Sequence, residues 1–470
     1  MKKKIALIPI DNRPVCYELP KMITDISNDV ELIMPNKEYL GSLSKSANTN
    51  ALFSWLCNLK NIECIVISLD TLIYGGLINS RRSPQTLQET IQQLEKLKKI
   101  LQKHNAKIYA FSSIMRISNN NINEEEKEYW SRWGKRIFDW SFNHHKFLNT
   151  NDSDALAKHC CISTTIPSEI LEDYLTTRKR NFEINKIYLS WLKEGLLDFL
   201  VFAKDDCAEY GLNVIEANEL QKIITENNLS AMVKTGADEI PLSLLSRIIS
   251  ENKQIKIYPK YTQPEGIEHI SKYEDISVKN SVISQIDLAG AKISTCETDA
   301  DFILFINNFK TTQGELVMNC FVEEFTKDFS LPNKPFAIAD ILNANGADNS
   351  FTNTLLSKDL SNLIGYSSWN TTGNTLGSVL FMAIMILCSD SKNQEAICKL
   401  FLTRFLDDWG YQANVRSKLK TISKFPDTKL LKEQLQPYET VLKKKFSIPY
   451  KHIVYSFPWN RFFEIEISIN

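Results

Sequence analysis

Short apolar runs alternate with longer amphipathic segments along most of this chain. The run at 199–203, Phe-Leu-Val-Phe-Ala, is apolar at every position, which is typical of a strand buried on both faces of a parallel sheet. The segments between the runs have apolar residues at helical spacing, and a regular alternation of strand and helix predicts an α/β fold with a mostly parallel sheet. The predicted strands are residues 5–10, 31–34, 64–69, 107–112, 199–203, 232–235, 255–258, 302–306, 336–339 and 365–368.

About ten strands is more than a single eight-stranded barrel needs. Two architectures fit this number: a TIM-barrel-like fold with extra elements, and two doubly wound Rossmann-like domains of about five strands each. Residues 118–198 have a largely helical pattern and are predicted to form an insertion, with the acidic run at 124–126 exposed. We therefore expect an α/β catalytic body over residues 1–425. A C-terminal helix and a β-prone tail that packs on the body are expected at 426–470.

The charge balance indicates no polyanionic partner. Lysine and arginine number 55 against 56 aspartates and glutamates, which gives a formal net charge of −1. Nucleic acids and anionic membrane surfaces attract clustered positive charge, so neither is an expected partner. The most apolar stretch, 377–388, is shorter than the roughly 18 residues that span a bilayer, and it is predicted to be a buried helix. The apolar run after the N-terminal lysines is also too short for a signal peptide, and a cytoplasmic location is expected.

The cysteines and histidines show no metal-binding or disulfide pattern. None of the 10 cysteines forms a C-x-x-C pair, and the 6 histidines lack a spacing such as H-E-x-x-H. Reduced cysteines and no metal or other cofactor are the expectation from these residues. Magnesium stays open as an alternative, because it prefers the carboxylate oxygens in which the predicted strand ends are rich.

Polar residues follow many of the predicted strands, and in parallel α/β folds ligands bind at these carboxyl ends. Any one of them could instead cap a helix or pair with a neighbouring charge. Taken together, they predict a pocket for a hydroxyl-rich ligand, in which Trp369 stacks on the apolar face of a sugar. The residues predicted to shape this pocket are Asp11, Arg13, Asp70, Arg116, Asp205, Asp340, Asn343, Trp369 and Asn370.

Several motifs spread over the whole chain carry a family resemblance. They are I-P-I-D-N-R-P, S-L-D-T-L-I-Y-G-G-L-I-N-S-R, R-N-F-E-I-N, K-D-D-C-A-E-Y-G, G-A-D-E, N-A-N-G-A-D, W-N-T-T-G-N-T-L-G and the closing P-W-N-R-F-F-E-I. Together they resemble the uncharacterised bacterial family called domain of unknown function 4127. The resemblance implies a cytoplasmic or peripheral enzyme and supplies no reaction.

Two acidic pairs, Asp205-Asp206 and Asp238-Glu239, follow successive predicted strands. Glycoside hydrolysis uses two carboxyl groups, one of which has a raised pKa and protonates the leaving oxygen. The sequence Gly236-Ala-Asp-Glu is similar to the Gly-x-Asp-Glu of family 20 N-acetylhexosaminidases, which implies Glu239 as general acid and Asp238 as the residue that orients an acetamido group. The pair Asp205-Asp206 resembles the adjacent aspartates of bacterial O-GlcNAcase-like enzymes.

These observations predict a carbohydrate-active enzyme of the glycoside hydrolase class. Its substrate would be a small molecule or an oligosaccharide, and the sugar that it recognises could be N-acetylated. In this prediction Glu239 is the general acid, and Asp238 or Asp206 is the stabilising carboxylate. Two alternatives from other classes stay open. One is a magnesium-dependent phosphoester or nucleotide-sugar enzyme, and the other is a sugar-binding protein without turnover. The oligomeric state is not predicted.

Overall fold

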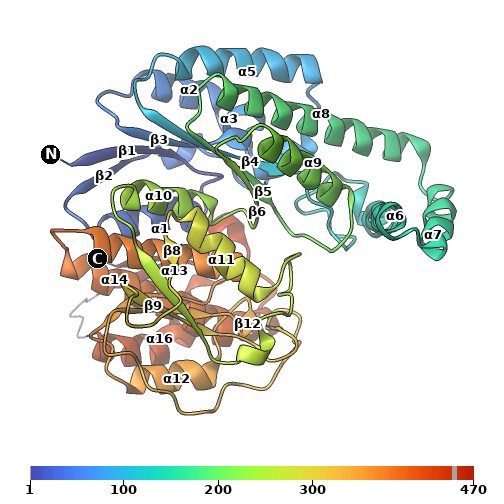
Figure 1. The fold of residues 1–470 in the computed structure, drawn as a ribbon. Helices are drawn as coiled ribbons and strands as arrows, with labels where there is room; N and C mark the ends of the chain where they lie inside the picture. Colours follow the sequence, from blue (N-terminus) through green and yellow to red (C-terminus); the bar gives the residue numbers. More distant parts are fainter. Residues whose placement is uncertain (1, 447–451, 470) are drawn as a thin grey trace.

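The computed structural model describes residues 2–446 and 452–469 of the chain. All ten predicted strands are present, each within about three residues of its predicted bounds. Together with the short strand β8 (Lys292–Ile293), which was not predicted, they form two open parallel sheets of six and five strands and do not close into one barrel. Figure 1 shows the two sheets as separate halves, one from the N-terminal and one from the C-terminal part of the chain. The α/β fold is therefore confirmed, in the two-sheet arrangement.

The first sheet has the order β2-β1-β3-β4-β5-β6, with every pairing parallel. Its first five strands follow the flavodoxin-like order 2-1-3-4-5, in which the connections reverse direction between the first and third strands. Its strands are β1 (Lys3–Ile8), β2 (Val30–Ile33), β3 (Cys64–Ser68), β4 (Lys107–Ile114), β5 (Phe199–Lys204) and β6 (Ala231–Thr235).

The second sheet has the order β13-β11-β9-β7-β8, again with parallel pairings. Counted from β7, this is the same 2-1-3-4-5 order, so the two halves share one topology. Its strands are β7 (Lys256–Tyr261), β8 (Lys292–Ile293), β9 (Phe302–Asn307), β11 (Phe336–Asp340) and β13 (Leu363–Ser367), and a small parallel pair joins β10 (Gly314–Glu315) to β12 (Asn343–Ala344).

Both faces of the central strands β3 and β5 are buried, which explains their apolar runs. Along β1, Ile5 and Leu7 belong to the large core that continues into the second half, whereas Ala6 and Ile8 belong to a separate core on the other face. The outer face carries α2 (Thr49–Cys57), α3 (Leu69–Tyr74), α5 (Leu87–Leu101), α8 (Ser168–Lys193) and α9 (Leu212–Glu226), and the inner face carries α1 (Pro14–Thr24) and α10 (Ile240–Ser250) (Figure 1).

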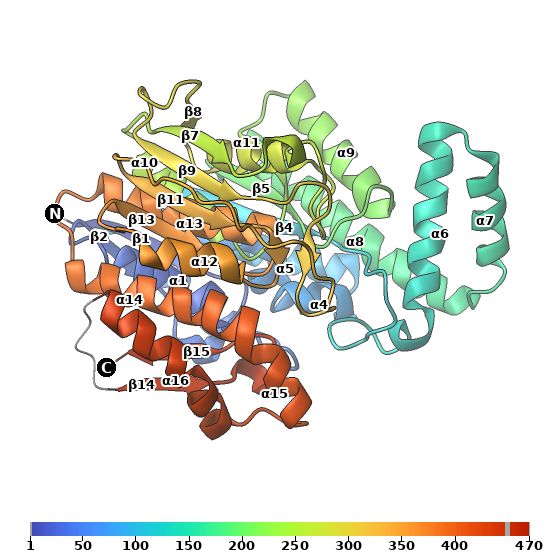
Figure 2. The same ribbon diagram turned by 90° about the horizontal axis from the view of Figure 1, so that it is seen from below.

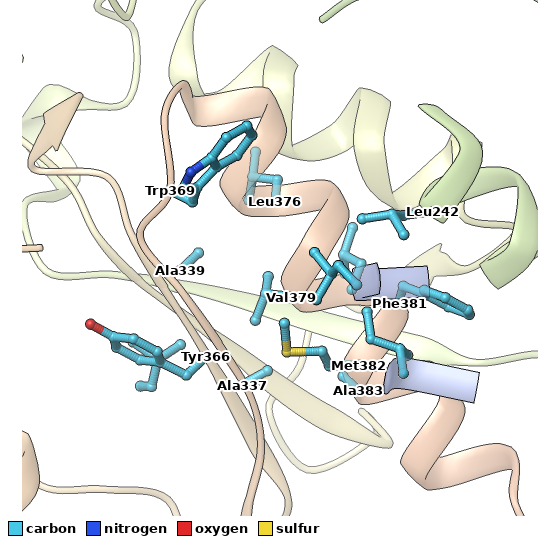
Figure 3. Close-up of a cluster of buried hydrophobic side chains, with 14 of the residues drawn as sticks. Leu242, Ala337, Ala339, Tyr366, Trp369, Leu376, Val379, Phe381, Met382 and Ala383 are labelled. Carbon is cyan, nitrogen blue, oxygen red and sulfur yellow. The ribbon is translucent and has the colours of Figure 1, made fainter. Parts of the chain in front are cut away.

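The two halves meet through α10 and α13 (Thr372–Cys388), which pack against each other. Figure 3 shows α13 covering β11 and β13 on one side while its Phe381 lies toward α10, which carries Leu242. Almost every residue of both helices is buried, whereas a helix of a TIM barrel keeps an outward face in solvent. This explains why the strands divide into two sheets around these helices. The buried helix predicted at 377–388 is confirmed, and within the described residues no helix is long and apolar enough to cross a membrane.

The predicted insertion at 118–198 contains three helices with different surroundings. The helices α6 (Trp130–Thr150) and α7 (Ser153–Ser163) pack on each other and project from the body (Figure 2). In contrast, α8 contacts β4 and β5 and is the crossover helix between these two parallel strands. The remaining elements of the two halves are α4 (Leu77–Arg82), α11 (Val278–Leu288), α12 (Asn349–Ser357), η1 (Lys37–Tyr39) and η2 (Pro264–Gly266).

The C-terminal part covers the second half and then returns to the first. Figure 2 shows its helices lying along one side of the body. The predicted β-prone tail contains the antiparallel pair β14–β15, and residues 447–451 and 470 of that tail lie outside the described residues. In the tail Glu466 accepts a hydrogen bond of 2.7 Å from Lys37. The elements are α14 (Gln394–Arg404), the π-helix η3 (Phe405–Val415), α15 (Arg416–Ile422), α16 (Thr428–Lys445), β14 (Ile453–Ser456), η4 (Pro458–Asn460) and β15 (Glu466–Ile469).

Candidate active site

A cleft of about 400 Å³ lies where both halves bring the carboxyl ends of their strands together. Its walls come from the segments after β1, β3, β4, β5, β6, β7, β10, β12 and β13, from the start of α15 and from the C-terminal tail. The predicted site residues that line it are Asp11, Arg13, Arg116, Asp205, Asp206, Asp238 and Asn370. Loops far apart in the sequence therefore meet at one place, as the strand-end pattern predicted.

Arg13 lies at the first strand end and pairs with two carboxylates. Its Nη2 and Nη1 donate to the two carboxylate oxygens of Asp238 at 2.6 and 3.1 Å, and its Nε donates to Asp11 at 2.8 Å. All three side chains are buried. Burial raises the pKa of Asp238, the attraction of Arg13 opposes this, and the charge of Asp11 adds to the rise. The bidentate pairing fixes the orientation of the Asp238 carboxylate.

A second arginine, Arg116, pairs with carboxylates from two loops. Its Nη1 donates to Asp205 at 3.2 Å and to Asp206 at 2.9 Å, while its Nε and Nη2 donate to Glu126 and Glu125 at 2.9 and 3.1 Å. Of the acidic run at 124–126, which was predicted to be exposed, Glu125 and Glu126 fold inward onto Arg116 and Glu126 is buried, whereas Glu124 is exposed. Arg81 also pairs with Glu125, Glu126 and Asp205, and Arg461 pairs with Glu125, so the four carboxylates around Arg116 are largely balanced by arginines.

Of the two adjacent aspartates, Asp206 is the more exposed to the cleft. Its side chain is 40% exposed, compared with 18% for Asp205. Enclosure in the cleft and repulsion from Asp205 raise the pKa of Asp206 to about 7, against the attraction of Arg116. The backbone of Asp206 also has φ of 39°, a left-handed conformation that non-glycine residues seldom adopt and that often marks a functional site. Near neutral pH this group both holds and releases a proton.

Asp70 lies beside these charged side chains, under the cleft surface. Its Oδ2 accepts hydrogen bonds from the backbone and the hydroxyl of Ser113, at 2.8 and 2.6 Å. Burial raises the pKa of Asp70 to about 6, although the Ser113 hydrogen bonds and the charge of Arg81 oppose the shift. Asp70 therefore supports the loop that carries Arg116, three residues after Ser113.

Glu239, the general acid predicted from sequence, does not line the cleft. It is fully buried at the start of α10, where its two carboxylate oxygens accept hydrogen bonds from Gln285 at 3.0 Å and from the Ala237 amide at 3.2 Å. A Cβ atom on Gly377 of α13 would lie 2.7 Å from its Cγ, so Glu239 fills the α10–α13 interface. Burial raises the pKa of Glu239 to about 8. The adjacent Asp238 points the other way, to Arg13 and the cleft.

Three further predicted residues also lie away from the cleft. Asp340 is fully buried and accepts a hydrogen bond of 2.9 Å from Asn307, which joins the ends of β9 and β11. Asn343 lies on β12, paired with β10. Trp369 is 3% exposed and packs edge-to-face with Phe463, so it belongs to the core and offers no stacking surface in the cleft.

The tail supplies cleft residues that the sequence did not single out. Trp459 lines the cleft and donates through Nε1 to Asn12 at 2.7 Å, while Arg461 pairs with Glu125 at 3.1 Å. Both belong to the closing P-W-N-R-F-F-E-I motif, which carried the only sequence signal for them. Further cleft residues that were not predicted are Tyr273, Glu315, Asn345 and Arg416.

Among the described residues, no group of three or more histidine, cysteine, aspartate or glutamate side chains is arranged to hold a metal ion. In the cleft, the carboxylates of Glu125, Asp205 and Asp206 are all paired with Arg116.

The fold and the cleft define a protein of two flavodoxin-like sheets with a carboxylate–arginine site between them. The chain belongs to the family described as "Protein of unknown function (DUF4127)", which matches residues 5–468. The family resemblance seen in the motifs is thereby confirmed. A comparison with curated proteins found no match.

Proposed function

We propose that the cleft hydrolyses glycosidic bonds and that Asp206 is its general acid. The observation that carries this proposal is a cleft-facing carboxyl group whose pKa lies near 7, beside a second carboxyl group in the same space. A general acid works best when its pKa is close to the working pH, because it must hold a proton and also give it up. In the proposed reaction Asp206 protonates the leaving oxygen as the bond to the anomeric carbon breaks.

Asp238 is the second carboxyl group of the proposal. It lines the main cleft and also a smaller recess, and Asp206 lines both of these spaces as well. Arg13 holds both of its oxygens, which orients the carboxylate and restricts its movement. Its role would be to stabilise positive charge on the sugar ring in the transition state and to orient the attacking water.

Binding of the sugar would draw on polar and aromatic groups from both halves. Asn370 and Asn345 line the second half of the cleft, and a backbone hydrogen bond of 2.8 Å between them ties their two loops together. Amide side chains both donate and accept hydrogen bonds, as hydroxyl groups require. Trp459 is the aromatic side chain of the proposal in place of Trp369, since its partly buried indole lies at the cleft. The guanidinium carbons of Arg461 and Arg13 lie 4.6 and 5.3 Å from its ring centre, so a sugar would contact the part of the ring that these arginines leave open.

The first experiment compares two carboxyl-to-amide variants on a panel of nitrophenyl glycosides that includes N-acetylated sugars. We expect wild-type hydrolysis to survive EDTA and to fall at least about 100-fold in Asp206→Asn, since a general acid contributes roughly 10²–10⁴ in rate. Glu239→Gln is the matched control, because Glu239 does not line the cleft, and it should stay within about threefold of wild type.

The outcomes separate the alternatives. Loss of activity in Glu239→Gln with retention in Asp206→Asn would return the acid role to Glu239. Activity abolished by EDTA would indicate the magnesium-dependent phosphoester or nucleotide-sugar enzyme. Tight sugar binding without turnover of any glycoside would indicate a binding protein. As part of the same proposal we place the enzyme in the cytoplasm, since none of its 10 cysteines forms a disulfide.

A further inference from the structure

Arg416 is a buried cation on the wall of the cleft. It is the first residue of α15 and directly follows the π-helix η3, a form of helix that often occurs at functional sites. Its side chain lines the cleft, although only 6% of the residue is exposed. A charge in such a position requires a partner or costs stability.

The surroundings of Arg416 hold its guanidinium in place, and the attraction of the more distant Glu315, Asp407 and Glu464 offsets only part of the effect of burial on its pKa. Its Nη1 donates to Gln412 Oε1 at 2.9 Å, and its guanidinium carbon lies 5.2 Å from the centre of the Phe463 ring. Gln412 is in turn fixed by a hydrogen bond of 3.2 Å to the carbonyl of Phe463. The Nε of Arg416 is enclosed and has no acceptor, and Nη2 donates to no described residue. Nε and Nη2 form the edge of a guanidinium that binds a carboxylate side-on.

The other cleft arginines differ in this respect. Arg13 and Arg116 each pair with carboxylates within hydrogen-bond distance. Among the described residues Arg416 has no carboxylate within ion-pair distance. Its neighbour Glu315 already accepts hydrogen bonds from the amides of residues 317 and 318 and from Asn345. Burial lowers the pKa of Arg416, as expected for a cation whose lost hydration is not fully replaced.

We propose that the unpaired edge of Arg416 binds a carboxylate of the substrate, so that the enzyme acts on acidic sugars such as uronic acid glycosides. The hydrolysis of acidic glycosides rests on the proposed function, whereas the binding of a carboxylate by Arg416 does not. A phosphate group would satisfy the same guanidinium, and a monoanionic carboxylate is favoured for two reasons. A single planar edge matches a planar carboxylate, and a phosphate dianion would be repelled more strongly by Asp206, Asp238 and Glu125.

The test measures binding separately from turnover. Calorimetric titrations of the full chain carrying Asp206→Asn, which removes the proposed acid, use phenyl glucuronide, phenyl glucoside and glucose 6-phosphate. We expect the glucuronide to bind at least tenfold more tightly than the glucoside. Adding Arg416→Gln should abolish this preference while the affinity for the glucoside stays within about twofold. Arg416→Lys keeps the positive charge but lacks the planar edge of the guanidinium, so this variant should show only part of the preference for the glucuronide.

The control is Arg247→Gln, which removes an arginine of α10 whose hydrogen bonds go to backbone carbonyls and which does not line the cleft. It should leave the preference for the glucuronide unchanged, and thermal unfolding of each variant confirms that the chain is folded.

If Arg416→Gln fails to fold, the affinities of the Arg416→Lys variant test the inference in its place. Equal binding of glucuronide and glucoside, or no binding of either, overturns the inference, as does a preference that survives Arg416→Gln. Tighter binding of glucose 6-phosphate assigns the anion as phosphate. If the chain binds the glucuronide selectively but the wild type does not hydrolyse it, the proposed reaction is refuted and the carboxylate-binding role of Arg416 is supported.

Discussion

Arg13 and Asp238 form a two-pronged ion pair across 225 positions of sequence, with Nη2–Oδ1 and Nη1–Oδ2 distances of 2.6 and 3.1 Å. The pair joins the loop after β1 to the loop after β6, although three strands separate β1 from β6 in the sheet. It is possible because α1 and α10, which follow these loops, both lie on the inner face of the sheet. The pair therefore links the two helices at the base of the cleft.

Breaking this pair on one side should destabilise the protein strongly. Arg13→Gln leaves the buried carboxylates of Asp11 and Asp238 without their cation, and losing one partner of a buried pair typically costs about 3–5 kcal/mol. The double variant Arg13→Gln, Asp238→Asn should be less destabilised than the sum of the two single changes, as urea unfolding would measure. A free energy of unfolding of Arg13→Gln within about 1 kcal/mol of the wild-type value would contradict this prediction.

The activity of the proposed hydrolase should decrease as the pH rises through about 7. Asp206 acts in its protonated form, and the pKa of Asp206 is raised to about 7 by enclosure and by Asp205. Asp205→Asn removes the repulsion, so the basic limb of kcat/KM should move to lower pH. Arg116→Gln removes an attraction, so the limb should move to higher pH. Both shifts are apparent values of the coupled pair, and a limb unmoved in either variant would argue against Asp206 as the acid.

Glu239 should make stability decrease with rising pH. Its pKa is about 8 in the folded chain and about 4.5 when unfolded, so the folded state holds the proton more tightly between these values. Unfolding then becomes easier by up to roughly 1.4 kcal/mol per pH unit as the pH rises from 4.5 to 8. Glu239→Gln should flatten this dependence in urea titrations at pH 5.5, 7 and 8.5. Glu433→Gln, at an exposed position of α16, should leave the dependence as in wild type.

The packing of α13 against α10 should account for much of the stability of the two-sheet arrangement. Phe381 is fully buried in this interface (Figure 3), and replacing a buried phenylalanine by alanine costs about 3–5 kcal/mol. Phe381→Ala should show this loss in chemical unfolding. Phe425→Ala, at a residue that is 73% exposed, is the matched control and should change stability by less than about 0.5 kcal/mol. Equal effects of the two changes would mean that the interface adds little.

The strands, most of the helices and part of the site follow from local sequence. Short, mostly apolar runs of four to six residues predicted the ten strands, and the reason is clearest for β3, β9 and β11, which are buried on both faces of their parallel sheets. The polar residues after those runs gave Asp11, Arg13 and the pair Asp205-Asp206, since parallel strands all end at one edge. The spacing of apolar residues and the polar residues that follow a strand are both properties of one short segment, so the sequence alone determines them.

Only the tertiary structure decided the number of sheets and the members of the cleft. Asp238 and Glu239 are adjacent in the chain, yet the start of α10 directs Asp238 to Arg13 and Glu239 into the interface with α13. Trp459 reaches the cleft because the C-terminal tail folds back onto the loop after β1, and Arg416 reaches it from the start of α15. Such positions depend on how distant helices pack, and no pattern within one segment contains that information. The pairing of charges between segments, and hence the pKa of Asp206, follows from the same packing.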